Sequence, residues 1–314
     1  CGIRGIEGYA EPILKDYKDQ IQLCGVYDIN YKRAALVSEY SDVAVPVFDD
    51  FDEMLRVTEP DTVIVTTKDS MHDFYAIKAL EAGCDVIVEK PLTTTFEKAN
   101  AIKVAEEKSG KTVTVVFNLR YLPFFARVKE LIADGVIGDV LSVHFEWLLD
   151  TQHGGDYFRR WHRDKRNSGG LMVHKSTHHF DLVNFWINSF PVKVYAQGGL
   201  KFYGRENAEE RGITKFYSRC YGSENAKGDP WAIDMTESDW LRELYLDAEK
   251  DDGYIRDQSV FGDNISIEDV MNVIVNYDNG AIMSYSLNAF SPYEGLNVCI
   301  TGTKGRVEMK LIES

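Results

Sequence analysis

The chain has 314 residues, and its 50 acidic and 35 basic side chains leave a formal net charge of −15. This length is typical of two domains, and a content of 44% hydrophobic residues excludes a globally disordered chain. The acidic balance argues against nucleic acid or an anionic membrane as a partner, because either would repel the chain. No apolar run is long enough for a transmembrane helix.

The cysteines are widely spaced and form no C-x-x-C pair: Cys1, Cys24, Cys84, Cys220 and Cys299. Several lie in apolar runs, which favours buried, reduced thiols in a reducing compartment. We therefore expect a cytoplasmic protein, with an export signal ahead of residue 1 left open.

The first third alternates short β-rich runs with helical patterns. Apolar runs predict strands over residues 21–27, 62–66, 85–88 and 112–117, and helical patterns cover 74–82 and 94–109. A capping box at Thr94–Glu97 begins the second of these helices, and Gly83 and Gly110 can end the two helices in the left-handed conformation. Pro12 should break or kink the first helix of the chain. Strands alternating with helices predict βαβ units and an α/β domain with a parallel sheet over residues 1–118.

The pattern changes after about Asn118, and residues 119–314 are expected to form an α+β domain with a mostly antiparallel open sheet. The predicted helices are 123–133 and 170–188, and the predicted strands are 140–149, 192–197, 268–277, 281–289, 296–301 and 306–311. Asn279-Gly280 between two β-rich runs predicts a hairpin with a type I′ turn. Residues 201–264 are polar and indicate an insertion, partly helical around 237–249.

The N-terminus carries part of the Rossmann dinucleotide-binding fingerprint, G-x-G-x-x-G. Gly2 and Gly5, with Ile3 and Arg4 between them, fit its second half, and the first glycine and its strand would precede residue 1. Asp28, at the end of an apolar strand, can accept hydrogen bonds from ribose hydroxyls and would repel a 2′-phosphate, which favours NAD over NADP. The alternative is that the glycines serve a turn and Asp28 caps a helix.

Several motifs further along the chain occur in a characteristic order. They are Val63–Thr67 followed by His72, the run Ala79–Gly83, Glu89-Lys90-Pro91, Asn118–Tyr121, and a helix holding Gly169-Gly170, His174, His178 and Asp181. In this order and spacing they resemble the glucose–fructose oxidoreductase, inositol dehydrogenase and rhizopine-catabolism (Gfo/Idh/MocA) family over nearly the whole chain. The resemblance implies a nicotinamide-dependent oxidoreductase acting on sugars or polyols. It also implies a homo-oligomer that forms through the open sheet of the second domain.

The resemblance places Lys90 beside the nicotinamide and the substrate hydroxyl, as a catalytic and cofactor-binding residue. A lysine at the carboxyl end of a parallel strand points into the cofactor crevice, and its ammonium can stabilise alkoxide character as hydride leaves. The alternative is a solvated surface lysine. The other cofactor-binding residues that the resemblance implies, with NAD as the cofactor, are Thr66, Thr67, His72, Glu89 and Asn118, and Glu89 would orient Lys90 or the cofactor.

The family's catalytic helix usually reads D-x-G-x-H-x-x-D, and its histidine is the general base. His178 matches that histidine, and an imidazole titrates close to operating pH. His174 replaces the usual aspartate, and because the two histidines are four residues apart they should share one helix face. Either His178 is less basic than the histidine of other family members, or both histidines take part in the proton transfer, or the substrate differs from theirs. Lys175 and His179 are expected on a solvated face.

A metal site is an alternative for this pair, because two histidines one helical turn apart can ligate zinc. Further candidate ligands are His153, Asp156 and His162. Nothing in the sequence fixes their geometry, so no metal is assigned.

Residues 151–167 are dense in His, Arg, Asp, Tyr and Trp, and they lie where a substrate loop is expected. Sugars are bound by planar polar groups and an aromatic platform, and the basic cluster could receive an anionic sugar. The alternative is a surface loop with salt bridges. The predicted substrate-binding residues are Arg120, Tyr157, Arg160, Trp161, His162 and Asp181.

The first functional hypothesis is an NAD-dependent sugar or polyol dehydrogenase. The second is a redox-neutral, NAD-dependent glycosidase or lyase of the same family. The third is a non-catalytic NAD-binding regulator that responds to sugars, and the presence of both Lys90 and His178 argues against it.

Overall fold

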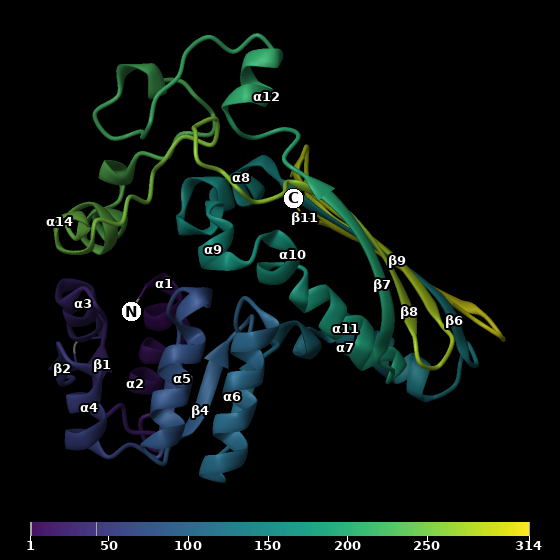
Figure 1. Cartoon of the computed structure of the whole chain (residues 1–314), viewed down its shortest axis with the longest axis horizontal. Helices are drawn as coiled ribbons and strands as arrows, with labels where there is room; N and C mark the ends of the chain where they lie inside the picture. The colour runs from purple at the N-terminus through teal and green to yellow at the C-terminus, as the bar shows by residue number, and fades with distance from the viewer. Residues whose placement is uncertain (1, 42, 314) are drawn as a thin grey trace. The chain divides into compact units, whose positions relative to one another are not determined.

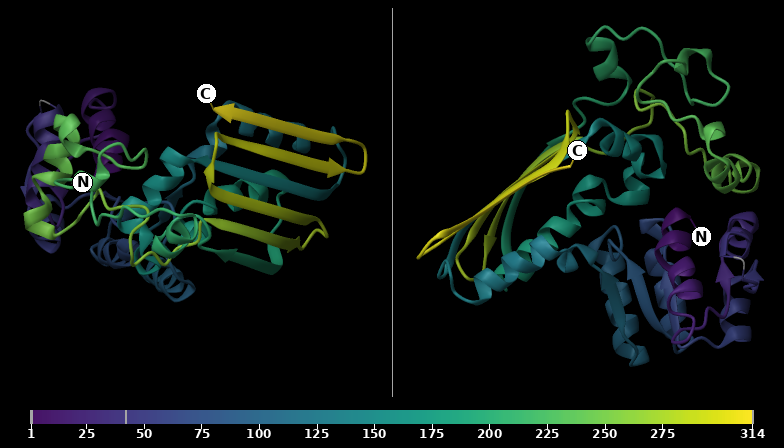
Figure 2. Two further views of the ribbon diagram at one scale, coloured as in Figure 1. Left: turned by 90° about the horizontal axis from the view of Figure 1, so that it is seen from above. Right: turned by 180° about the vertical axis from the view of Figure 1, so that it is seen from behind.

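The computed structural model describes residues 2–41 and 43–313, so Cys1 lies outside the described residues. The chain forms two compact units, whose elements are drawn in Figures 1 and 2. Unit 1 consists of Cys1–Val116 and Ile233–Asp257, and unit 2 of Phe117–Ala232 and Gln258–Ser314. Residues 233–257, which the sequence analysis places in an insertion of the second domain, thus cluster with the first domain. We call this segment the strap.

Unit 1 contains two small parallel sheets. β3 (Thr62–Val65), β4 (Asp85–Glu89) and β5 (Val113–Val116) form one, and β1 (Val26–Tyr27) pairs with β2 (Val47–Phe48) in the other. The longer helices are α3 (Tyr31–Ser41), α4 (Phe51–Thr58), α5 (His72–Glu81) and α6 (Phe96–Ser109). Val86 and Val88, which point to the same face of the central strand β4, are buried. The predicted parallel sheet is confirmed, but β1 covers only the end of the predicted strand 21–27.

The helix boundaries follow the turn and cap signals closely. Thr95 rather than Thr94 caps α6, its hydroxyl accepting a hydrogen bond from the Lys98 N–H at 3.4 Å. Gly83 and Gly110 follow α5 and α6 with φ of 85° and 69°, so both adopt the predicted left-handed conformation.

Pro12 disturbs the first helical segment. α1 (Ile3–Gly5) passes into a π-helical turn (Ile6–Ala10) and then into α2 (Glu11–Lys15), which has Pro12 in its first turn. Proline has no N–H to donate to the carbonyl four residues earlier, so a regular α-helical ladder cannot run through it. The predicted interruption is confirmed.

Unit 2 is built on one six-stranded sheet. Its order is β11-β10-β6-β9-β8-β7, and each neighbouring pair is antiparallel except β6 with β9. The strands are β6 (Val140–Asp150), β7 (Pro191–Gly199), β8 (Val270–Tyr277), β9 (Ile282–Ser291), β10 (Glu294–Gly302) and β11 (Arg306–Glu313). Phe145 and Tyr285 of the sheet pack in one core with Phe125 of α7 (Pro123–Ala133) and Trp186 of α11 (Thr177–Ile187). The predicted mostly antiparallel sheet is confirmed.

The hairpin between β8 and β9 is present, but its turn is not type I′. That turn type needs positive φ at both central residues, and of the turn residues Gly280 has φ 88° whereas Asn279 is not left-handed. The Gly280 N–H donates to the Tyr277 carbonyl at 3.0 Å, so the chain makes a longer turn that ends in a left-handed glycine.

The predicted helix 170–188 is two helices, α10 (Leu171–His174) and α11 (Thr177–Ile187). Ser176 causes the break: its N–H and its hydroxyl both donate to the Leu171 carbonyl, at 2.9 and 3.2 Å. A serine side chain that bonds to a nearby carbonyl competes with the helical ladder. His174 and His178 therefore lie in two different helices, not in the one continuous helix that was expected.

The remaining elements are short. Unit 2 holds α8 (Thr151–Arg159), a 3₁₀ turn (Trp161–Arg163), α9 (Lys165–Ser168) and α12 (Arg205–Glu210), and the strap holds α13 (Asp239–Leu241), a π-helical turn (Arg242–Leu246) and α14 (Glu249–Asp252). Over residues 2–41 and 43–313, none of the helices combines the length and the apolar character needed to cross a membrane.

Candidate cofactor and substrate sites

The N-terminal glycines occupy two different environments. A Cβ built on Gly5 would stand 2.8 Å from the Thr66 hydroxyl oxygen, just beyond β3, whereas a Cβ on Gly2 would meet its nearest neighbour, the Tyr245 hydroxyl, at 3.9 Å. Gly5 therefore lets the first helix approach the end of β3, which is the role of the third glycine of a dinucleotide fingerprint.

Glu89 connects this glycine segment to the lysine that follows β4. Its Oε1 accepts hydrogen bonds from Arg4 Nε at 2.6 Å and from the Tyr9 hydroxyl at 2.8 Å. Its Oε2 accepts from the Lys90 N–H at 3.1 Å. Burial and the Glu89 carboxylate raise the pKa of Tyr9 well above its usual range. Glu89 thus holds the main chain at Lys90 through one oxygen and the first helical segment through the other.

His72 joins the loops that follow β3 and β4. Its side chain is almost fully buried, with Nδ1 2.8 Å from the Pro91 carbonyl oxygen and Nε2 3.2 Å from the Thr67 carbonyl oxygen. Both ring nitrogens thus contact main-chain oxygens, so the ring fixes the segments that carry Thr67 and Lys90.

Asp28 stands one residue beyond β1, where the sequence places a ribose-binding carboxylate. Its Oδ1 accepts the Asn30 N–H at 2.9 Å and lies 3.5 Å from Arg33 Nη1. The side chain is 12% exposed, so protein contacts set its orientation.

A cavity of about 500 Å³ lies between the two sheets of unit 1, beside β1 and β3. Its lining is mostly apolar, which does not suit the charged phosphates of a dinucleotide, and we assign no ligand to it. Its lining includes Ile13, Leu23, Val26, Val63, Val65 and Tyr75.

In unit 2, four of the predicted side chains form one cluster. Trp161 stacks on His162 with ring centroids 3.6 Å apart, and His162 meets His174 at 4.3 Å. Tyr157 lies 5.5 Å from His174. The structure thus brings the aromatic segment and His174 together in one cluster, in which Tyr157, His162 and His174 are buried and Trp161 is partly exposed.

His178 lies in α11, apart from α10, which carries His174. It is 8% exposed, and its ring packs edge-on to Phe117 at 6.0 Å. An imidazole held against an aromatic wall has few available orientations, which suits a positioned proton acceptor.

His153 and Glu294 lie next to Tyr157, and neither is among the predicted substrate-binding residues. His153 Nε2 lies 3.1 Å from the Tyr157 hydroxyl, and His153 Nδ1 lies 3.1 Å from Glu294 Oε1. Glu294 also accepts the Asp150 N–H at 2.9 Å. Burial by itself would raise the pKa of Glu294, but its hydrogen bonds from His153 and the main chain outweigh burial and hold the pKa below its usual value. Glu294 is 141 residues from His153, so no local motif could reveal this pair.

Two predicted substrate-binding arginines contact carboxylates of the protein. Arg120 donates to both oxygens of Asp181, with Nε and Nη2 at 2.7 and 2.5 Å, and this pairing raises the pKa of Arg120. Arg160 donates to Asp156 at 3.1 Å. Asn118, predicted at the cofactor, begins a 3₁₀ turn (Asn118–Tyr121) and is exposed.

The expectation of a solvated His179 was wrong. Its side chain is fully buried, stacks on Trp147 at 4.3 Å and places Nδ1 2.8 Å from the Tyr285 hydroxyl. The break at Ser176 changes which residues of this segment face the sheet. Lys175 remains partly exposed, with its ammonium 4.9 Å from the centre of the Trp147 ring.

The sequence leaves a metal site at the histidines as an alternative. In the part of the chain that the structure describes, no group of three or more His, Cys, Asp or Glu side chains is placed to hold a metal ion.

Comparisons with known proteins agree with this description. Residues 1–117 match the Gfo/Idh/MocA model described as an oxidoreductase family with an NAD-binding Rossmann fold, and residues 129–314 match the model of its C-terminal alpha/beta domain. The YteT protein of Bacillus subtilis (strain 168) is 41% identical over 98% of this chain and 75% of its own length.

More distant relatives share the fold. A glucose-6-phosphate 3-dehydrogenase of Bacillus subtilis (strain 168) is 26% identical over 64% of this chain, which covers 57% of that enzyme. The crystal structure of the WlbA dehydrogenase from Chromobacterium violaceum, in complex with NADH and UDP-GlcNAcA, matches with a TM-score of 0.70 and 19% identity, over 99% of this chain and 74% of that one.

Proposed function

The chain belongs to the Gfo/Idh/MocA oxidoreductase family, with an NAD-binding Rossmann domain, and we propose that it is an NAD-dependent dehydrogenase of a sugar, sugar derivative or polyol. The proposal rests mainly on the hydrogen bonds of Glu89. This side chain accepts from the Lys90 N–H and from Arg4, so it holds the main chain at Lys90 next to the glycine segment. The glucose-6-phosphate 3-dehydrogenase among the relatives supports a sugar as substrate.

In this proposal most of the residues that bind the dinucleotide belong to unit 1. Gly2, Ile3, Arg4 and Gly5 border the phosphates, and Asp28 accepts hydrogen bonds from the adenosine ribose. Thr66, Thr67 and Asn118 complete the cofactor contacts, while His72 and Glu89 hold the loops in place.

The substrate is bound by unit 2. Tyr157, Trp161 and His162 offer flat faces and hydrogen-bonding edges to a sugar ring, and His174 adds a further imidazole to this cluster. The proposed substrate site also includes Arg120, Arg160 and Asp181. Since Arg120 and Asp181 are bound to each other, we infer that their pair orients the site as one unit.

Bound NAD supplies the hydride acceptor. His178 takes the proton of the substrate hydroxyl. The C–H bond at the carbon that bears this hydroxyl breaks, and its hydrogen leaves with both bonding electrons as a hydride. The alcohol thereby becomes a ketone. The Lys90 ammonium stabilises the negative charge that develops on the oxygen.

We also propose a homo-oligomer that forms through the large sheet of unit 2. Tyr195 of β7 and Ile274 of β8 are register partners and are 61% and 50% exposed. Large apolar side chains exposed as a group mark a contact surface. Light scattering should show an oligomer, and Ile274→Glu should shift it towards monomer.

The test is an assay of reduced nicotinamide by its absorbance, with NAD and a panel of hexose phosphates, free hexoses, inositols and uronic acids. Formation of one NADH per ketone produced supports the proposal. Cleavage of a glycoside without net NADH would point to the redox-neutral alternative. Tight NAD binding with no reaction of any sugar would point to a regulator.

A further inference from the structure

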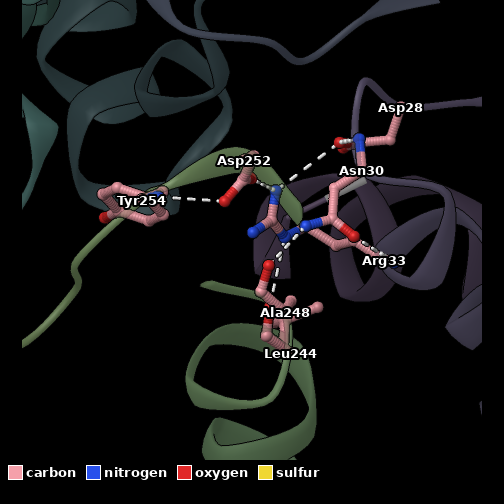
Figure 3. Close-up of polar contacts among 7 residues, drawn as sticks. All are labelled: Asp28, Asn30, Arg33, Leu244, Ala248, Asp252 and Tyr254. Atoms are coloured by element: carbon pink, nitrogen blue, oxygen red, sulfur yellow. Dashed lines mark hydrogen bonds and ion pairs between the residues drawn. The ribbon is translucent and has the colours of Figure 1, made fainter. Parts of the chain in front are cut away.

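Arg33 is held in a buried ion-pair cluster that links α3 to the strap (Figure 3). Its Nη1 lies 2.8 Å from Asp252 Oδ2 and 3.5 Å from Asp28 Oδ1. The side chains of Arg33, Asp252 and Asp28 are 8%, 6% and 12% exposed, so water screens these charges little. Two carboxylates and one guanidinium give the cluster a net charge of −1.

The strap is fixed onto this region by main-chain contacts as well. Arg33 Nε donates to the Leu244 carbonyl at 3.1 Å, and Asn30 Nδ2 donates to the Ala248 carbonyl at 2.9 Å. Asp252 is itself oriented, because its Oδ1 accepts the Tyr254 N–H at 3.0 Å. Figure 3 shows Arg33 in contact with Asp28, Leu244 and Asp252, with the Asn30–Ala248 and Tyr254–Asp252 hydrogen bonds beside it.

A cation beside the ribose-binding carboxylate has a known chemical consequence. An arginine in this neighbourhood can accommodate the 2′-phosphate of NADP, whereas a carboxylate repels it. In this chain the Arg33 guanidinium is turned onto Asp252, which lies 219 residues away in the sequence.

We propose that Asp252 is a positioning residue for cofactor specificity: by binding Arg33, it keeps the region around Asp28 negative and so favours NAD over NADP. The inference rests on the proposed NAD-dependent function and adds a residue of the strap to it. Asp252 acts through Arg33 and need not touch the cofactor.

The test measures the dissociation constants of NAD and NADP for the full chain by calorimetric titration. Asp252→Asn changes the cluster charge from −1 to 0 and releases Arg33, so the ratio of the NADP to the NAD dissociation constant should fall by about tenfold or more. Asp252→Glu should retain most of the preference for NAD. Asp251→Asn is the matched control: Asp251 pairs at 3.3 Å with the half-exposed Lys32, and its loss should change the ratio less than about twofold.

Because Asp252 acts through Arg33, Asp252→Asn should leave the ratio nearly unchanged in an Arg33→Met background. If Asp252 only stabilises the fold, Asp252→Asn should weaken the binding of NAD and of NADP equally. The ratio of their dissociation constants would then stay unchanged, which would overturn the inference. If Asp252→Asn does not fold, Arg33→Met decides alone, since loss of the guanidinium shared by Asp28 and Asp252 should widen the preference for NAD by about threefold or more. An unchanged or narrower preference would overturn the inference. Failure of the parent protein to bind either dinucleotide would instead contradict the proposed function.

Discussion

Gly5 and Thr66 approach so closely that a Cβ on Gly5 would stand 2.8 Å from the Thr66 hydroxyl oxygen. This distance is shorter than an ordinary contact between a carbon and an oxygen atom, so any side chain at residue 5 requires one of the two segments to move. The threonine is β-branched and stiff about χ1, which limits how far it can adapt.

We therefore expect Gly5→Ala to lower the free energy of unfolding by about 1–3 kcal/mol, the usual cost of overpacking. Urea unfolding measures the effect. Removing the hydroxyl by Thr66→Ala should restore part of the loss in the double variant, because the next atom, Thr66 Cβ, is 3.8 Å away. Gly2→Ala is the control, since its nearest contact is at 3.9 Å. Equal destabilisation at both glycines would contradict the packing argument.

Lys90→Met should lower turnover by about 10²-fold or more while leaving the NAD dissociation constant within about twofold, because the ammonium acts on charge that develops in the transition state. Steady-state kinetics and a separate NAD titration distinguish these effects. Lys103→Met, at an exposed position of α6, removes the same charge and should change neither value. A weaker affinity for the sugar with turnover unchanged would make Lys90 a binding residue.

The break at Ser176 predicts separate roles for the two histidines. His178→Ala should lower kcat by about 10²–10⁴-fold, the range for a positioned general base. His174→Ala should mainly raise the KM for the sugar, by about tenfold, since His174 packs on His162 and Tyr157. The two effects should then multiply in the double variant. Strong non-additivity would show instead that the pair works as one unit, as their spacing in the sequence suggested.

Much of the fold could be predicted because its signals are local. The apolar run of β4, the cap of α6 and the glycine that ends it all lie within a few residues of the feature they determine. The resemblance to the family likewise depends on short motifs such as Glu89-Lys90-Pro91. Such patterns indicate where elements begin and end, and which residues share a face.

The parts that could not be predicted depend on distant partners. Ser176 accepts a hydrogen bond from the Tyr285 hydroxyl, 109 residues away, and its break separates His174 from His178. Asp252 meets Arg33 only because the strap returns to unit 1. A helical pattern in the sequence cannot indicate either contact, since each depends on tertiary packing.

The buried Glu294 should make the stability of the fold depend on pH in the acid range. Its hydrogen bonds from His153 and from the Asp150 N–H hold its pKa below the usual value in the folded chain, despite burial. A carboxyl whose pKa is lower in the folded than in the unfolded state stabilises the fold above its ordinary pKa of about 4.3, and this contribution disappears as pH falls through the folded pKa.

Glu294→Gln should therefore lower the free energy of unfolding by about 1.5–3 kcal/mol at pH 7, the range for a hydrogen bond to a charged group. Its difference from the parent should shrink as pH falls below about 4, where the parent's carboxyl also loses its charge. Urea unfolding at pH values from 7 to 3 measures both curves. His153→Ala removes one donor, so the parent's loss of stability should begin at a higher pH in that variant. If the free energy of unfolding of Glu294→Gln differs from that of the parent by the same amount at every pH from 7 to 3, the prediction is contradicted. The negative charge of Glu294 would then contribute nothing to stability.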